Sequence, residues 1–266
     1  MSLLELPFDT VHLWCALTGE HDSAMAEPFA LWMSEDERAR YERFRLPRDK
    51  HQYLATRVLV RTTLSSYAAV PPAAWRFTAN QHGRPEIYEP SGVEWLRFNL
   101  TNTNGLVACA VIRDGDVGVD AEDITRAGDA ASLARRFFAP KEFADFQRAP
   151  DAATQRERFA AYWTLKEAYL KARGIGLSVP LEQIAFVLSD DMRDARIEAD
   201  LSVSDGAESE WQFALLKATD RHLIALATKG TTRRSFGVHV RQGFPSPNGI
   251  SQTDLGVPRP FGSGVL

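Results

Sequence analysis

The sequence predicts an α+β protein with two similar lobes, each a small antiparallel sheet with packed helices. Its 266 residues exceed the roughly 150 residues of an average domain, which favours two lobes over one. Helical and strand patterns occur in both halves, and a polar turn at 113–116 separates them. We therefore expect an N-terminal lobe over 1–113, a C-terminal lobe over 114–240 and a flexible Gly/Pro-rich tail over 241–266.

The first half opens with a candidate strand and two candidate helices. Residues 11–17 form the strand candidate, and Ser-Glu-Asp-Glu at 34–37 is a capping-box pattern that begins a helix to about residue 44. A second helix is expected over 51–67, and Pro71 and Pro72 prevent it from continuing further. Arginines lie along this second, mostly apolar helix.

Strand patterns dominate the middle of the chain. Segments 95–101, 106–112 and 117–122 are separated by Asn- and Gly-containing turns, which predicts three adjacent antiparallel strands. Residues 130–173 have a helical pattern that ends at Gly174. The remaining strand candidates lie at 184–188, 211–217, 222–228 and 236–240.

Composition and charge exclude several classes of protein. The net charge of −4 does not indicate a general nucleic-acid binder, although a local arginine cluster could still bind a small phosphorylated ligand. Two cysteines cannot build a disulfide framework, and neither has zinc-ligand spacing. No apolar run reaches the roughly 18 residues of a membrane span, and the N-terminus carries acids where a signal peptide has basic residues. We expect a cytoplasmic protein that binds neither nucleic acid nor membrane.

Asp120 and Glu122 are a candidate pair of metal ligands. They lie two apart on a predicted strand, so both side chains leave the same face. Close carboxylates repel each other, and a hard divalent cation such as Mg²⁺ stabilises their ionised form. From spacing alone, two solvated acids at a strand end explain the pattern as well.

Glu167 and Lys171 lie four apart on the predicted long helix, with Trp163 one turn earlier. By itself this is the ordinary solvated helix pair. The aromatic residues of the same helix indicate burial, however, and charges on a buried helix need partners.

Other polar residues have spacings compatible with phosphate contacts. Arg57 and Arg84 carry guanidinium groups that match phosphate oxygens, although either could be an ordinary surface arginine. Thr101 and Asn102 end a strand and offer a hydroxyl and an amide, or serve plain turn chemistry. His82, beside Gly83, has the pattern of a solvated loop residue.

Four segments together resemble the Sfp-type 4′-phosphopantetheinyl transferases. They are RFNLTNT at 97–103, VGVDAED at 117–123, RRFFAPKEF at 135–143 and WTLKEAYLKARGIGL at 163–177, in that order. The Gly-Val-Asp-Ala-Glu stretch and Trp-x-x-Lys-Glu-Ala-x-x-Lys are the most specific parts. The resemblance covers about residues 34–228 and implies a pseudo-twofold fold with the active site in the cleft between the lobes.

The resemblance implies transfer of the phosphopantetheine arm of coenzyme A to a serine of an apo acyl or peptidyl carrier protein, with release of 3′,5′-ADP. It implies that Asp120, Glu122 and Glu167 hold Mg²⁺, with Asp120 and Glu167 also catalytic and Glu167 the candidate base. Lys171 would act on the departing phosphate. The residues implied to contact coenzyme A are Arg57, His82, Arg84, Thr101, Asn102, Lys166 and Lys171.

One departure from the family pattern concerns coenzyme A affinity. The family usually has histidine where this chain has Asn102, and an amide cannot carry a positive charge. We therefore expect weaker binding of coenzyme A and reduced activity relative to a histidine version.

Two other functions fit the same residues. The first is a Mg²⁺-dependent nucleotide pyrophosphatase, which would use water as the nucleophile. The second is a binding module for coenzyme A or carrier proteins that has lost the catalytic activity.

The choice of carrier protein depends on the complementarity of two protein surfaces, so the biosynthetic pathway served stays open. A two-lobed chain with a complete cleft is expected to act as a monomer.

Overall fold

The computed structural model describes residues 3–19, 31–126, 129–189, 191–192, 195–199, 210–229 and 236–245. The chain divides into two compact units. Within the described parts, the first unit contains 3–81 apart from the gap at 20–30, together with 85–114 and 237–245; the second contains 82–84, most of 115–229 and residue 236. In this part of the chain no helix is long and apolar enough to cross a lipid bilayer.

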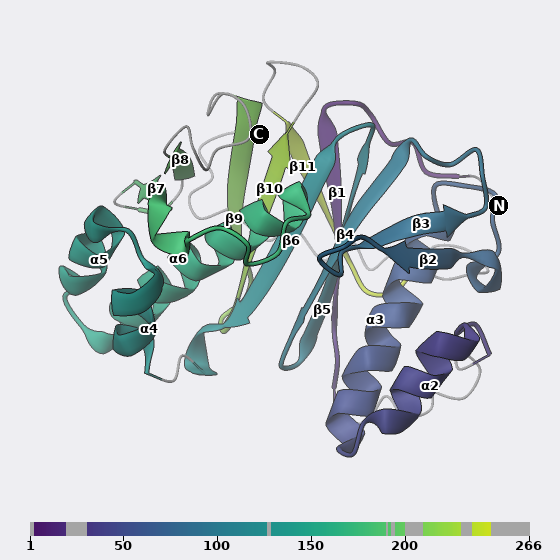
Figure 1. The fold of residues 1–266 in the computed structure, drawn as a ribbon, viewed down its shortest axis with the longest axis horizontal. Helices are drawn as coiled ribbons and strands as arrows, with labels where there is room; N and C mark the ends of the chain where they lie inside the picture. Colours follow the sequence, from purple (N-terminus) through teal and green to yellow (C-terminus); the bar gives the residue numbers. More distant parts are fainter. Residues whose placement is uncertain are drawn as a thin grey trace. The chain divides into compact units, whose positions relative to one another are not determined.

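A four-stranded sheet forms the centre of the first unit (Figure 1). Its order is β11-β1-β5-β4, from Gly237–Gln242, Thr10–Leu17, Leu106–Arg113 and Leu96–Thr103. Helix α3 (Pro47–Ser65) packs on β5 and β4, and α2 (Glu35–Arg43) packs on α3. A short hairpin, β2 (Arg76–Ala79) and β3 (Pro85–Glu89), follows the 3-10 turn η2 (Pro72–Ala74).

The second unit is built around a three-stranded sheet of order β6-β10-β9 and one long helix (Figure 1). The strands are Asp116–Asp123, His222–Lys229 and Trp211–Thr219, and α6 (Ala152–Arg173) packs on β6 and β10. Helices α4 (Ala130–Phe137) and α5 (Pro140–Gln147) also pack on α6. The 3-10 turns η3 (Ile124–Arg126) and η4 (Leu181–Gln183) and the pair β7 (Ile184–Leu188) and β8 (Ala195–Ala199) complete the described part.

The strand pairing corrects two predictions. Strand β5 pairs with β4 on one side and β1 on the other, so β6 is not the third neighbour and joins β10 in the second unit. Strand β11 was expected in the C-terminal lobe, but it pairs with β1 in parallel, with His12 opposite His239. The first sheet is therefore not purely antiparallel. Of the predicted tail, residues 241–242 belong to β11, and 246–266 lie outside the described residues.

The predicted helix at 130–173 is three helices. Pro140 occupies the first turn of α5, and the preceding Ala139 is extended, which ends α4. Asp151 then caps α6 by accepting a hydrogen bond from the backbone N–H of Thr154 at 2.8 Å. Helix α6 ends at Gly174, whose φ of 66° is left-handed.

Gly118 allows β6 and α6 to lie unusually close together. A Cβ atom at this position would lie 1.9 Å from the carbonyl oxygen of Ala168 and 2.4 Å from the nitrogen of Ala172. The glycine thus sets the distance between the strand that carries Asp120 and the helix that carries Glu167.

Candidate active site

Strand β6 and helix α6 bring the predicted acidic residues and Lys171 together in the second unit. Asp120 and Glu122 lie on one face of β6, as their spacing predicts. Lys171 donates hydrogen bonds from Nζ to Asp120 Oδ1 at 2.6 Å and to the Val119 carbonyl oxygen at 3.2 Å. Glu167 stands one turn before Lys171 on α6.

The pKa values show that these groups act on one another. Burial raises the pKa of Glu122 to about 7, and the negative charge of Asp120 adds to this effect. Burial also raises the pKa of Glu167, again reinforced by Asp120. Lys171 opposes both increases because its positive charge favours ionised carboxylates. Three acids and one ammonium group therefore form a coupled set.

The donor chemistry of this set fits a hard divalent cation, although the side chains do not converge as metal ligands. In the described part of the chain, no group of three or more His, Cys, Asp or Glu side chains has a geometry that could hold a metal ion. Carboxylate oxygens are the ligands that Mg²⁺ prefers, and Asp120 already contacts a cation, the ammonium of Lys171. The ligand set Asp120, Glu122 and Glu167 remains a prediction.

Lys166 does not lie where the resemblance implies. Its side chain is completely buried and pairs with the equally buried Glu142, with Nζ and Oε2 2.8 Å apart. Lys166 also donates to the carbonyl oxygens of Leu181 and Ile184. One residue is about 100° of helical turn, so Lys166 and Glu167 point in different directions from α6. Lys166 is a structural residue of the core, which corrects its predicted contact with coenzyme A.

Arg84 and His82 belong to the second unit, although their position in the sequence predicted the first. Arg84 donates from Nη1 to the carbonyl oxygen of Ala172 at 2.7 Å, near the end of α6. The ring of His82 lies beside Gly176, in the loop after that helix. Their contacts with coenzyme A stay predictions.

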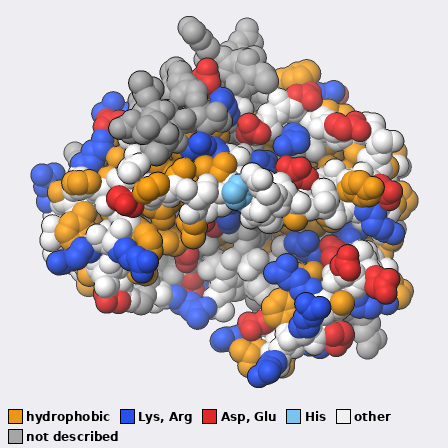
Figure 2. Space-filling model, in the orientation of Figure 1, with side chains coloured by type: hydrophobic (Ala, Val, Ile, Leu, Met, Phe, Trp, Pro, Cys, Tyr) orange, Lys and Arg blue, Asp and Glu red, His pale blue; other side chains and the backbone are white. Residues whose placement is uncertain are grey.

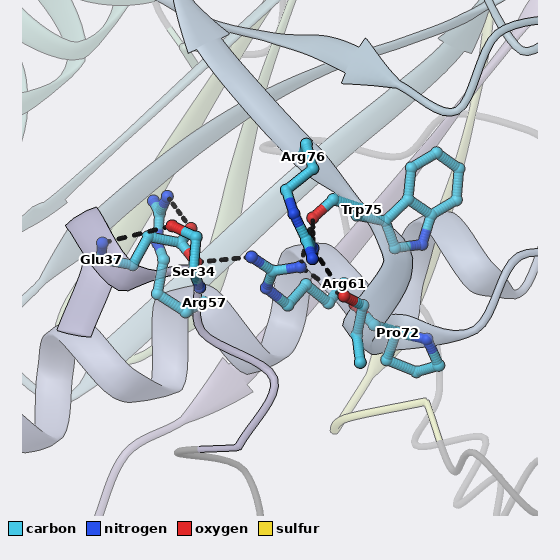
Figure 3. Close-up of polar contacts among 8 residues, drawn as sticks. Ser34, Glu37, Arg57, Arg61, Pro72, Trp75 and Arg76 are labelled. Atoms are coloured by element: carbon cyan, nitrogen blue, oxygen red, sulfur yellow. Dashed lines mark hydrogen bonds and ion pairs between the residues drawn. The ribbon is translucent and has the colours of Figure 1, made fainter.

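A second charged cluster lies in the first unit, where Glu37 connects two arginines of α3 (Figure 3). Glu37 is 3.4 Å from Arg57 Nη1 and 2.5 Å from Arg61 Nη2. Its carboxylate also accepts a hydrogen bond from the backbone N–H of Ser34, which completes the predicted capping box. Burial by itself would raise the pKa of Glu37, but Arg61, the Ser34 N–H and Arg57 together outweigh burial and lower it.

The two arginines have different surroundings. Arg61 is 1% exposed and donates to the carbonyl oxygens of Pro72 and Trp75 at 3.0 and 2.7 Å (Figure 3). Arg57 is 17% exposed and contacts Glu37 only through Nη1, while its buried Nε has no hydrogen-bond partner among the described residues. Arg57 is thus the member of the cluster that can still bind an anion.

Thr101 and Asn102 are adjacent on β4 and therefore point to opposite faces of the sheet. Thr101 is buried, whereas Asn102 is exposed. The strand ends at Thr103, so both residues lie near the end of the strand, as predicted, and the turn to β5 begins after them. Only one of the two side chains can line a given ligand surface, and the exposed Asn102 is the accessible one.

The structure adds two residues that the sequence interpretation did not select. Glu37 was recognised only as a helix cap, and its separation of 20 positions from Arg57 gave no sign of the ion pair. Glu142 lies in the RRFFAPKEF segment, but its partner Lys166 is on another helix. Glu142 is the third residue of α5, the glutamate position of a capping box, but the sequence interpretation did not predict a helix that begins at Pro140.

Comparisons with known proteins place both halves of the chain in one family. The sequence model of the 4′-phosphopantetheinyl transferase superfamily matches residues 116–227, and that of the 4′-phosphopantetheinyl transferase N-terminal region matches residues 23–113. The second unit thus carries the superfamily's signature, including the β6 and α6 residues described above.

Individual relatives agree with these matches. The chain is 36% identical over 186 residues to the 4′-phosphopantetheinyl transferase HetI of Nostoc sp., covering 70% of this chain and 77% of HetI. It is 30% identical over 220 residues to a phosphopantetheinyl transferase of Thraustochytrium sp., covering 79% and 74%. A 4′-phosphopantetheinyl transferase of Bacillus subtilis is 32% identical over 174 residues, covering 65% and 72%. The chain belongs to the 4′-phosphopantetheinyl transferase superfamily.

Among solved structures, the holo-[acyl-carrier-protein] synthase of Thermotoga maritima aligns with a TM-score of 0.35 and 22% identity. The alignment covers 44% of this chain and 64% of that protein.

Proposed function

We propose that this protein transfers the phosphopantetheine arm of coenzyme A to a serine hydroxyl of an apo acyl or peptidyl carrier protein, with Mg²⁺, and releases 3′,5′-ADP. Membership of the superfamily supports phosphopantetheinyl transfer. The observation that carries the finer proposal is the coupled set of Asp120, Glu122, Glu167 and Lys171 on adjoining elements.

The reaction is a phosphoryl transfer with a simple balance of bonds. The serine oxygen bonds to the coenzyme A phosphorus that carries the pantetheine arm. The bond from that phosphorus to the bridging pyrophosphate oxygen breaks, and 3′,5′-ADP leaves with this oxygen. The serine proton must move to a base, because the serine oxygen carries no hydrogen once it is part of the phosphodiester product.

The residues of β6 and α6 can supply these steps. Glu167 accepts the serine proton, directly or through a water, and its raised pKa makes it a stronger base than an exposed glutamate. Lys171 neutralises the phosphate of the departing nucleotide. Asp120, Glu122 and Glu167 would hold Mg²⁺, which neutralises charge on pyrophosphate oxygens when bound.

Arg57 is the proposed contact for the 3′-phosphate of coenzyme A. The side chain of Arg57 is 17% exposed and pairs with Glu37 at 3.4 Å, whereas Arg61 is 1% exposed and donates to carbonyl oxygens and to Glu37. A guanidinium binds phosphate through paired hydrogen bonds, so this interaction should weaken as salt increases.

The surface of α4 and α5 is the proposed contact for a carrier protein. Leu133 is 38% exposed, and two arginines lie over aromatic rings, Arg135 over Phe143 and Arg136 over Phe137. Figure 2 shows apolar and basic side chains intermixed over this part of the second unit. Such a surface complements the acidic, partly apolar helix that carrier proteins often present.

Intact-protein mass spectrometry tests the proposed function. Apo acyl and peptidyl carrier proteins are incubated with coenzyme A, Mg²⁺ and this protein, with EDTA and a carrier Ser→Ala variant as controls. We expect the carrier mass to rise by one phosphopantetheine, with no rise in either control. Phosphopantetheine released from coenzyme A with no carrier modified would instead support a pyrophosphatase, and binding of coenzyme A with neither reaction would support a binding module.

A further inference from the structure

Lys171 is held by Asp120, one of the three acidic residues that the proposed function assigns to a metal ion. Its Nζ lies 2.6 Å from Asp120 Oδ1, and the Asp120 side chain is only 10% exposed. The ammonium is therefore the cation that Asp120 binds in this structure.

The charges explain why an ammonium is stable there. Asp120, Glu122 and Glu167 act on one another as like charges in a partly buried setting, where solvent screens them less than at the surface. Lys171 is the positive charge that lowers this repulsion, and it does so for both glutamates. A divalent cation would relieve the same repulsion more strongly.

We propose that Lys171 is the resident counter-ion of this acidic set in the metal-free protein and that it competes with a divalent cation for Asp120. Divalent cation binding then releases the ammonium from Asp120 and leaves it able to approach the departing phosphate. The inference rests on the proposed function for the identity of the phosphate, but the competition itself concerns only this chain and a cation.

The partial exposure of the Lys171 side chain makes such an exchange feasible. Lys171 is 29% exposed, so its ammonium can move while the stem of the side chain stays packed. Its second contact, to the Val119 carbonyl oxygen at 3.2 Å, is a neutral hydrogen bond and is weaker than the ion pair. Removing the ammonium should therefore leave the fold intact while making the acidic set more negative.

Titration with Mn²⁺ in the absence of coenzyme A and carrier tests the competition, because free Mn²⁺ is measured directly by electron paramagnetic resonance. We expect Lys171→Gln to bind Mn²⁺ roughly three- to tenfold more tightly than the wild-type protein, since one positive charge beside a divalent ion is lost. Lys171→Arg keeps the charge and should not gain affinity. Lys217→Gln is the matched control, because Lys217 forms an ion pair with Glu157 at 3.2 Å elsewhere in the unit.

A double-mutant cycle tests whether the effect acts through Asp120. In an Asp120→Asn background, Lys171→Gln should change the Mn²⁺ affinity much less than it does in the wild-type protein. Equal or weaker Mn²⁺ binding by Lys171→Gln, or no binding by any of these proteins, would overturn the proposal. Tighter Mn²⁺ binding without transfer to any carrier would keep the competition and reject the proposed function.

Discussion

At the scale of single residues, Gly118 is the position where the chemistry depends most on the backbone. Strand β6 and helix α6 approach so closely that no Cβ atom fits there, since the nearest atom would be a backbone oxygen at 1.9 Å. A backbone atom cannot move aside as a flexible side chain can, so any substitution must push the strand and helix apart.

We therefore predict that Gly118→Ala lowers the free energy of unfolding by about 1–3 kcal/mol and reduces transfer activity. Urea denaturation and a transfer assay measure the two effects. Gly19→Ala is the control, because a Cβ at Gly19 meets no atom within 4 Å. Equal effects of the two substitutions would contradict the close approach of β6 and α6.

His12 is a second residue with a measurable consequence. It is 3% exposed, and its Nδ1 forms a hydrogen bond with the Tyr67 hydroxyl at 2.7 Å. Burial lowers the pKa of His12 to about 4, helped by the positive charges of Arg241 and His239. The folded protein thus keeps His12 neutral at a pH where the unfolded chain binds a proton.

The sign of the pH dependence follows from this difference. Between pH 6.5 and about 4 the unfolded state binds the additional proton on His12, so the contribution of His12 to stability decreases as the pH falls, by at most roughly 3 kcal/mol. Glu122 acts in the opposite direction over much of this range, because its raised pKa gives the folded state an extra proton. We therefore compare urea denaturation of the wild-type protein and His12→Gln at several pH values and expect the stability of the wild-type protein relative to the variant to decrease as the pH falls from 6.5 to about 4. A stability difference that does not change with pH would contradict a buried neutral His12.

At the scale of elements, the buried pair of Glu142 and Lys166 joins four pieces of the second unit. Glu142 accepts hydrogen bonds from the backbone N–H groups of Ala139 and Phe186, both at 2.7 Å. Lys166 on α6 reaches carbonyl oxygens of η4 and β7. The pair fixes the rotation of α6 about its axis and thereby the direction of Glu167.

Lys166→Met should destabilise the protein by about 3–5 kcal/mol, because it leaves the carboxylate of Glu142 buried without its positive partner. Lys217→Met at the more exposed pair with Glu157 should cost no more than about 1 kcal/mol. Thermal or urea denaturation compares the two. Similar small losses would show that Glu142 does not depend on Lys166.

The elements also show where sequence interpretation succeeds and fails. Local signals predicted the capping box of α2, the strand alternation that aligns Asp120 with Glu122, and the end of α6 at Gly174. The breaks at Pro140 and Asp151 were missed because the apolar periodicity continues across them, although the proline and the helix cap were visible signals. Lys166 was misassigned because burial of a lysine depends on a partner from another helix.

At the scale of the whole molecule, the pairing of distant segments was the least predictable feature. Strand β11 lies more than 200 positions from its partner β1, and neither segment's pattern specifies a parallel partner. The same limit applies to Glu37 and Arg57, whose ion pair joins two helices. The acidic residues of the candidate site were found because an ordered set of motifs resembles a family, whereas their coupling to Lys171 required the structure.

The central claim is that the acidic set on β6 and α6 catalyses transfer to a carrier protein. The most direct measurement is the initial rate of mass gain by an apo carrier, compared between the wild-type protein, Glu167→Gln and Glu157→Gln. Both glutamates lie on α6, but Glu157 pairs with Lys217 outside the acidic set. We predict a loss of roughly 100-fold or more for Glu167→Gln and a near-wild-type rate for Glu157→Gln. A Glu167→Gln protein that modifies the carrier at the wild-type rate would contradict the account.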